Sequence, residues 1–180
     1  MKFSNCCVYQ IYPKSFYDSK GDGLGDIRGI IEKLDYIASL GVDYVWITPF
    51  FVSPMKDNSY DIADYRNINP SFGTMADFDE LVAEAGKRGI GLMLDLVLCH
   101  SSDQHEWFQR AIAGDERYQR YYIFRDGKAP GEPPTNWQCA FGGSAWEWEP
   151  HIKKWYLHLH DVSQPDFDWT NPEVRRELAD

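Results

Sequence analysis

The first hundred residues alternate between short apolar runs and stretches with helical spacing. Residues 8–12 (VYQIY), 44–48 (YVWIT) and 91–100 (GLMLDLVLCH) predict three strands. Apolar residues three and four positions apart predict a helix between the first two strands, which Gly41 ends. They are Ile27, Ile30, Ile31, Leu34, Ile37 and Ala38. With a second helix before the third strand, this order predicts a parallel sheet with right-handed crossovers.

The second helix is predicted from the capping signal Thr74-Met75-Ala76-Asp77. We expect a long loop to lead from residue 48 to this helix and Gly89 to end it. Its expected inner stripe consists of Phe78, Leu81, Val82 and Ala85.

The segment 91–100 is almost continuously apolar, which is typical of a central parallel strand covered on both faces. Asp95 within it needs a partner, because a buried carboxylate is costly unless it is paired or hydrogen-bonded. His100 ends the strand, where α/β enzymes bind their ligands. A capped strand end and a structural buried histidine are alternatives that this segment alone leaves open.

After His100 the periodic pattern stops. Residues 101–168 are too long for a simple connection and predict an inserted subdomain. Asn171 and Pro172 then predict the start of a helix. We therefore expect barrel residues at 1–100, the inserted subdomain at 101–168, and a return to the barrel at 169–180. Because the third helix leaves the sheet unfinished, we expect this chain to be the N-terminal part of a longer protein.

Composition narrows the function further. A formal net charge of −10 argues against a nucleic-acid partner, which would require a basic surface. No run approaches the about 20 apolar residues of a membrane span, and the first residues lack a signal-peptide core, so we expect a cytoplasmic protein. Four cysteines without CxxC spacing favour reduced thiols. The aromatic content of 16% is compatible with a core rich in aromatic side chains or with surfaces that stack on sugar rings.

Six short motifs, in order and at compatible spacing, resemble the α-amylase superfamily of glycoside hydrolases (family 13), and within it the oligo-1,6-glucosidase and α-glucosidase branch. They are Val8-Tyr9-Gln10-Ile11-Tyr12-Pro13, Asp22-Gly23-Leu24-Gly25-Asp26, Asn58-Ser59-Tyr60-Asp61-Ile62, Phe72-Gly73-Thr74, Asp95 to His100, and Gln164-Pro165-Asp166. The resemblance implies an α/β fold, a (β/α)8 TIM barrel of which this chain holds about the first three strands, with a small domain inserted after the third.

The activity that the resemblance implies is retaining hydrolysis of α-glucosidic bonds in oligosaccharides, with an Asp nucleophile and a Glu acid/base. In relatives both carboxylates lie on later strands, so we expect them beyond residue 180 and expect the chain alone to be inert. A non-catalytic member of the superfamily that serves as a binding protein or transporter partner is the alternative.

The resemblance also implies which residues meet the sugar. His100 would donate a hydrogen bond to a hydroxyl of the glucose, Tyr60 would stack on the sugar face, and Asp61 would bind hydroxyls at the closed end of the pocket. Phe141 would contact the substrate from the inserted domain. Asp95 would support the site from behind, paired with an arginine outside this chain.

Several positions depart from the family pattern. Ser59 stands where relatives usually have Gly, and mild strain is expected if this position takes positive φ. Cys99 stands where relatives have Asn, and a thiol is a weaker donor and acceptor. The last two residues of the segment 164–168 (QPDFD) differ from the branch pattern, which leaves undetermined the glucosidic linkage that is cleaved.

His100 and His105 could be interpreted as a zinc-binding pair. The sequence lacks the His-Glu-x-x-His arrangement and a third ligand for it.

The loop 18–26 is typical of a calcium site, with Asp18, Asp22, Leu24 and Asp26 as candidate ligands. Related enzymes bind calcium or magnesium here. Lys20 occupies a position that is commonly Asn, and its ammonium would repel a divalent ion. We therefore predict that Lys20 replaces the cation as an internal counter-charge, and we expect no other cofactor.

Overall fold

The computed structural model describes residues 5–179, and the chain forms two compact units. The first runs up to Val52 and includes Tyr65–Leu96, and the second comprises Ser53–Asp64 together with the chain from Val97 onward. The change of unit after Leu96 lies close to the expected end of the first segment at residue 100. The division into 1–100, 101–168 and 169–180 stays a prediction.

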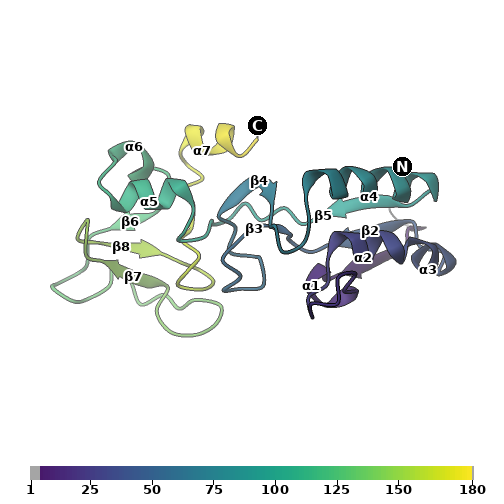
Figure 1. The fold of residues 1–180 in the computed structure, drawn as a ribbon. Coiled ribbons are helices and arrows are strands. Elements are labelled where there is room, and N and C mark those ends of the chain that lie inside the picture. The colour runs from purple at the N-terminus through teal and green to yellow at the C-terminus, as the bar shows by residue number, and fades with distance from the viewer. Residues whose placement is uncertain (1–4, 180) are drawn as a thin grey trace. The chain divides into compact units, whose positions relative to one another are not determined.

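The first unit contains the predicted parallel sheet (Figure 1). Its strands are β1 (Val8–Ile11), β2 (Tyr44–Ile47) and β5 (Gly91–Leu94), in the order β1-β2-β5. Both pairings are parallel, with Ile11 opposite Ile47 and Ile47 opposite Leu94. The predicted α/β class and parallel pairing are therefore confirmed, and three strands form an open sheet among the described residues.

The single helix predicted after β1 is divided into α2 (Ile27–Glu32) and α3 (Leu34–Ser39). Lys33 lies between them with φ −101° and ψ 4°, and its amide donates to the carbonyl of Ile30 in a tighter turn. The buried residues still follow the predicted stripe across this break, as Ile27, Ile30, Leu34 and Ile37. A short helix α1 (Pro13–Phe16) precedes them.

The helix α4 (Met75–Lys87) begins with the predicted capping box between Thr74 and Asp77 and packs against α2. Leu81 and Ala85 are buried, but Val82 is 47% exposed, so its place in the inner stripe was wrong. Val82 follows Leu81 directly, and one residue turns the helix by about 100°, away from the buried line.

The expected long loop after β2 contains two further strands, β3 (Phe51–Val52) and β4 (Asp64–Ile68), which pair with each other. Both are short, and β4 contains charged residues, which explains why hydrophobic periodicity did not reveal them.

The strand β5 is shorter and less buried than expected. It ends at Leu94, which is 40% exposed, and Leu96 is 74% exposed. Within the described sheet β5 is an edge strand, so one side of it lacks a neighbouring strand. The prediction of a strand buried on both faces is therefore wrong for the chain as described.

The second unit is built on a different plan. Its helices α5 (Glu106–Ile112) and α6 (Glu116–Gln119) pack together, and three short strands form an antiparallel sheet in the order β6-β8-β7. These strands are β6 (Phe124–Arg125), β7 (Trp146–Glu149) and β8 (Lys154–Leu157). The helix α7 (Pro172–Glu177) follows, with Asn171 as the predicted cap accepting from the amide of Glu173.

Aromatic rings form the core of this second unit. Phe108 contacts Tyr122 edge-to-face with ring centroids 5.1 Å apart, and Tyr156 at 5.2 Å. Phe124 stacks at 6.1 Å from the same ring. Many aromatic residues therefore fill the core, whereas Trp137 and Phe141 are exposed.

Candidate active-site region

His100 is buried, and two of its contacts define its protonation. Its Nε2 lies 3.1 Å from the carbonyl oxygen of Tyr60, to which it donates, and its Nδ1 lies 3.1 Å from Sγ of Cys99. Burial lowers the pKa of the imidazole, and the neighbouring His160 adds to this effect, while the Tyr60 carbonyl opposes it. His100 is therefore a neutral imidazole with its proton on Nε2, and Nδ1 accepts from the Cys99 thiol.

Two more rings continue from His100. His160 lies with its ring centroid 5.1 Å from that of His100, and Phe141 lies 6.3 Å from His160 in an edge-to-face arrangement. Phe141 is 64% exposed. The four predicted sugar-contacting residues, Tyr60, Asp61, His100 and Phe141, thus occupy one unit. The ring of His160 contacts those of His100 and Phe141.

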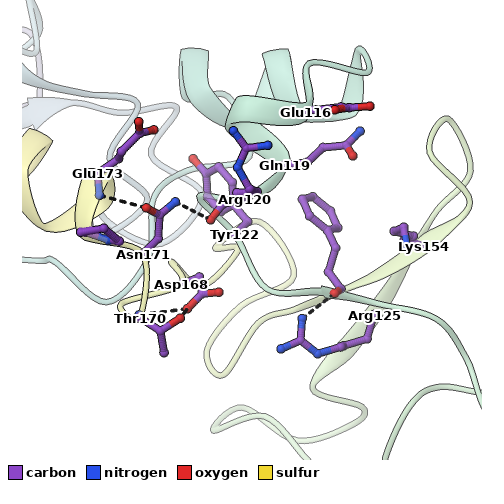
Figure 2. Close-up of a pocket in the computed structure, with 12 residues that line it drawn as sticks. Glu116, Gln119, Arg120, Tyr122, Arg125, Lys154, Asp168, Thr170, Asn171 and Glu173 are labelled. Atoms are coloured by element: carbon purple, nitrogen blue, oxygen red, sulfur yellow. Dashed lines mark hydrogen bonds between the residues drawn. The ribbon is translucent and has the colours of Figure 1, made fainter.

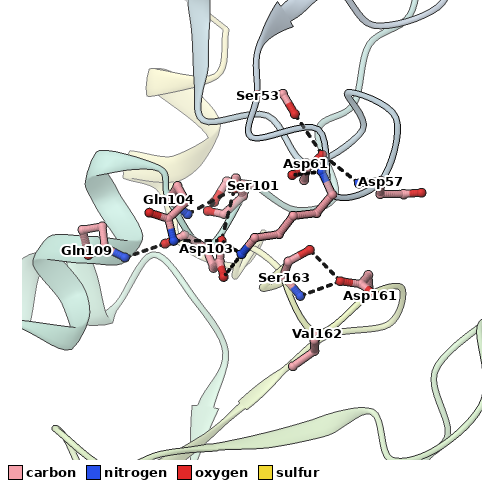
Figure 3. Close-up of polar contacts among 12 residues, drawn as sticks. Ser53, Asp57, Asp61, Ser101, Asp103, Gln104, Gln109, Asp161, Val162 and Ser163 are labelled. Carbon is pink, nitrogen blue, oxygen red and sulfur yellow. Dashed lines mark hydrogen bonds and ion pairs between the residues drawn. The ribbon is translucent and has the colours of Figure 1, made fainter.

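Asp61 is fully buried in the loop between β3 and β4 (Figure 3). Its carboxylate accepts from the hydroxyl of Ser53 at 2.9 Å and from the amides of Lys56 and Asp57 at 3.0 and 3.1 Å. A carboxylate has about four lone-pair positions, so three in-chain donors leave one. These bonds hold the loop around Asp61 and satisfy its buried charge.

The same loop is fastened to the segment after β8. The Nε2 of the buried Gln164 donates to Asp57 at 2.8 Å, and its Oε1 accepts from the amide of Asp161 at 2.9 Å. Nζ of Lys56 pairs with Asp103 at 2.7 Å. The glutamine of the segment 164–168 therefore positions the loop that carries Tyr60 and Asp61.

Asp166 is a buried carboxyl beside this cluster. It accepts from the amide of Leu159 at 2.5 Å, and its backbone pairs with that of His100. Burial raises the pKa of Asp166 to about 6, although the Leu159 amide and His160 act in the opposite direction. Partial burial of the sulfur, followed by the Asp166 carboxylate, raises the pKa of the Cys99 thiol.

Asp95 belongs to the first unit, unlike the predicted sugar-contacting residues. It is partly buried, and its amide donates to the carbonyl of Ile47 at 3.3 Å, which continues the parallel pairing past β5. Its proposed arginine partner lies outside this chain and stays a prediction.

In the loop 18–26, backbone amides surround Asp18. The amides of Lys20, Gly21 and Gly23 donate to its carboxylate at 3.0, 2.7 and 2.7 Å, and they lower its pKa, the Gly23 bond most strongly. Asp22 accepts from the amide of Leu24 at 3.0 Å.

The buried Asp26 of the same loop caps α2 by accepting from the Gly29 amide at 2.6 Å, and it accepts from Ser19 at 2.8 Å. Nζ of Lys20 lies 3.8 Å from Asp26. The residues present fit a divalent cation poorly. The ammonium of Lys20 lies beside the Asp26 carboxylate, and backbone amides already donate to the carboxylates of Asp18 and Asp22.

His105 does not join His100. Its Nδ1 accepts from the amide of Trp107 at 3.1 Å, which makes His105 the N-cap of α5. Burial lowers its pKa to about 4. His105 therefore caps a helix and does not pair with His100.

A separate pocket of about 740 Å³ lies in the second unit between α6, β6 and the segment before α7 (Figure 2). Arg120, Arg125 and Lys154 line it together with Glu116, Asp168 and Glu173. Its mixed charges are balanced, and it contains none of the predicted sugar-contacting residues.

Sequence reasoning missed three contributors to the site. His160 and Asp57 lie in segments without periodicity, and Gln164 was read only as a marker of the branch. The signal that could have found them is the polar residue content of segments 53–61 and 158–168, which a buried loop needs to satisfy its backbone groups.

Parallel strands with their carboxyl ends leading to polar loops define an α/β enzyme-like fold, and comparison with known proteins identifies the family. Residues 10–180 match the alpha-amylase catalytic domain, so the chain belongs to the alpha-amylase family.

The chain is similar to several curated relatives. It is 52% identical to trehalose-6-phosphate hydrolase of Escherichia coli (strain K12) over 98% of the chain and 32% of the relative. It is 56% identical to oligo-1,6-glucosidase of Parageobacillus thermoglucosidasius over 95% of the chain and 30% of the relative. The chain thus spans about a third of the length of these relatives.

The chain is also similar to several solved structures. A trehalose-6-phosphate hydrolase from Bacillus licheniformis superimposes with a TM-score of 0.93 at 55% identity, covering 96% of this chain and 31% of that one. The trehalulose synthase MutB from Pseudomonas mesoacidophila gives a TM-score of 0.93 at 52% identity, with the same coverage. Among the described residues, no helix has the length and apolar character that crossing a membrane requires.

Proposed function

We propose that the protein containing this chain is a retaining α-glucosidase that hydrolyses α-glucosidic bonds of oligosaccharides, and that this chain supplies part of its sugar pocket. The nucleophile and the acid/base would come from residues outside residues 1–180. The observation that carries the proposal is the alpha-amylase family match together with the clustering of Tyr60, His100 and Phe141 in one unit. A cytoplasmic location stays a prediction.

His100 would act as a neutral hydrogen-bond donor to a glucose hydroxyl. Its pKa is lowered by burial, so the ring keeps one proton at neutral pH. In this structure that proton lies on Nε2 and is given to the Tyr60 carbonyl. Substrate binding would exchange this acceptor for a sugar hydroxyl, and the bond would strengthen as positive charge develops on the sugar ring.

Tyr60 and Asp61 would bind the closed end of the sugar. The Tyr60 ring would offer an apolar face to the sugar, and Asp61 would use its remaining lone-pair position to accept from a hydroxyl. Asp95 would support the site through its arginine partner. Lys20 would replace the calcium ion of related loops as a counter-charge to Asp26.

The proposal is tested on the full protein as its gene encodes it, with isomaltose, maltose and trehalose 6-phosphate as substrates. We expect hydrolysis of at least one, with α-glucose as the first product seen by proton NMR. We expect Asp61→Asn to lower kcat/KM by roughly 100-fold, the cost typical of losing one transition-state hydrogen bond. Asp103→Asn, in the same cluster, should stay within threefold of the parent.

Absence of hydrolysis of every α-glucoside would favour the binding-protein alternative. Equal losses in the Asp61→Asn and Asp103→Asn variants would mean that Asp61 only holds its loop.

A further inference from the structure

We propose that Cys99, His100 and His160 form a binding site for a thiophilic divalent cation of the zinc class. Their ligand atoms all lie within 4.8 Å of one another, and no other group of three histidine, cysteine or acidic side chains among the described residues is so arranged. One thiol and two imidazoles are ligands that zinc accepts and that calcium does not.

The spacing of these atoms fits a tetrahedral ion. Zinc–nitrogen and zinc–sulfur bonds of about 2.0–2.3 Å place neighbouring ligand atoms roughly 3.3–3.6 Å apart. Sγ of Cys99 and Nδ1 of His100 are already 3.1 Å apart, and the widest separation in the group is within 4.8 Å. An adjustment of about 1 Å would therefore bring three ligands to bonding distance, and water would take the fourth tetrahedral position.

The tautomer of His100 is set for metal binding. A histidine that binds a metal through one ring nitrogen normally donates the other N–H to a carbonyl or carboxylate. The Nε2 of His100 donates to the Tyr60 carbonyl, which leaves the lone pair of Nδ1 directed at the Cys99 sulfur. The Tyr60 carbonyl is thus already in place as the hydrogen-bond partner that a metal-bound His100 would need.

His160 supplies a third ligand with a nitrogen to spare. Its Nδ1 is buried and has no hydrogen-bond partner among residues 5–179, which is costly for a polar atom. The carboxylate of Asp166 acts electrostatically on both His160 and Cys99. A cation held by the three ligands would therefore also be attracted by a nearby negative charge.

One consequence rests on the proposed function. An ion on Nδ1 would tie His100 to Cys99 and His160 and place a charge beside the sugar pocket. Zinc at concentrations that fill the site would then inhibit hydrolysis, and a chelator would restore it.

The test uses Co²⁺ as a spectroscopic substitute for zinc, with the full protein under reducing conditions. We expect a thiolate-to-cobalt charge-transfer band, intense visible bands of a tetrahedral ion, and displacement by an equivalent of Zn²⁺. Cys99→Ser should abolish the charge-transfer band. His160→Gln should weaken affinity by at least the roughly 10- to 100-fold that losing an outer partner costs.

Cys139→Ser and His151→Gln are matched controls, because both residues lie in the same unit outside the group, and both should bind like the parent. No charge-transfer band in the parent, or a band that survives Cys99→Ser, would overturn the proposal. Because cobalt binding needs no substrate, a protein without glucosidase activity that still binds through Cys99 would refute the proposed function alone. Active protein without the band would refute the metal site alone.

Discussion

The two units of the chain reach stability by different means. The first buries aliphatic side chains such as Ile30, Leu34 and Val45 between a parallel sheet and its helices. The second packs aromatic rings around Phe108 and encloses polar residues that include His100, His105 and Asp166. Regular packing thus supports the first unit, whereas the second holds most of the proposed sugar pocket.

The difference between the units explains why the polar candidate site lies among the loops of the second unit. Regular elements satisfy their backbone groups internally, so their side chains need only be apolar. The loops of the second unit need side chains such as Asp61 and Gln164 to satisfy neighbouring amides and carbonyls. The same requirement places polar and titratable groups close together, where they can bind a ligand.

The largest expected effect concerns the aromatic core. We expect Phe108→Ala to lower the free energy of unfolding by about 3–5 kcal/mol, because the change leaves a cavity among three rings. Leu34→Ala in the first unit serves as the comparison, at about 2–5 kcal/mol. Urea denaturation of the full protein measures both. A cost under about 1 kcal/mol for Phe108→Ala would show that the rings do not form a tight core.

The next effect is a pH dependence of stability that arises in the second unit, at His105. His105 titrates near 6.5 when unfolded but at about 4 when folded, so the unfolded state takes up its proton first. The contribution of neutral His105 to the free energy of unfolding is therefore complete above pH 6.5. It is lost as the pH falls towards 4, by up to roughly 3 kcal/mol.

His105→Asn keeps a capping acceptor without a titrating group. The difference in unfolding free energy between parent and variant should change along this pH interval. Because Asp166 contributes with the opposite sign in an overlapping interval, only this difference isolates His105. A difference that is constant with pH would contradict the buried, neutral state of His105.

A third effect tests the loop 18–26 of the first unit. We expect Lys20→Asn to allow calcium binding and the parent to be insensitive, since Lys20 lies beside Asp26. At 100 times Kd, binding would stabilise the variant by about 2.7 kcal/mol, seen as a higher Tm. Lys14→Asn, just before this loop, is the control. A large calcium-dependent rise in the Tm of the parent would refute the replacement.

The smallest expected effect lies at Ser59. Its φ of +77° meets the condition under which strain was expected, since Gly adopts this left-handed conformation without strain. We expect Ser59→Gly to raise the free energy of unfolding by about 0.5–1 kcal/mol. Loss of the contact between the Ser59 hydroxyl and Met55 works against this gain. A destabilised variant would mean that the contact outweighs the strain.

The sequence predicted the first unit better than the second for a physical reason. Burial on one helix face leaves a period, so α4 and the stripe through Leu34 could be read directly. The second unit buries rings from short, irregular segments, and these leave no period. His100 was found because the apolar run 91–100 ends there. His160 reaches the same place only through tertiary folding. Leu96 lies beyond the end of β5 and is exposed, although it stands in an apolar run.

The most direct test of the central claim compares the full protein with its His100→Gln variant in the presence of a chelator. If His100 donates a hydrogen bond to the glucose in the transition state, kcat/KM for an α-glucoside should fall by roughly 100-fold or more. The free energy of unfolding should change by less than about 1 kcal/mol. Unchanged kcat/KM, or a loss that only follows a loss of folded protein, would contradict the account.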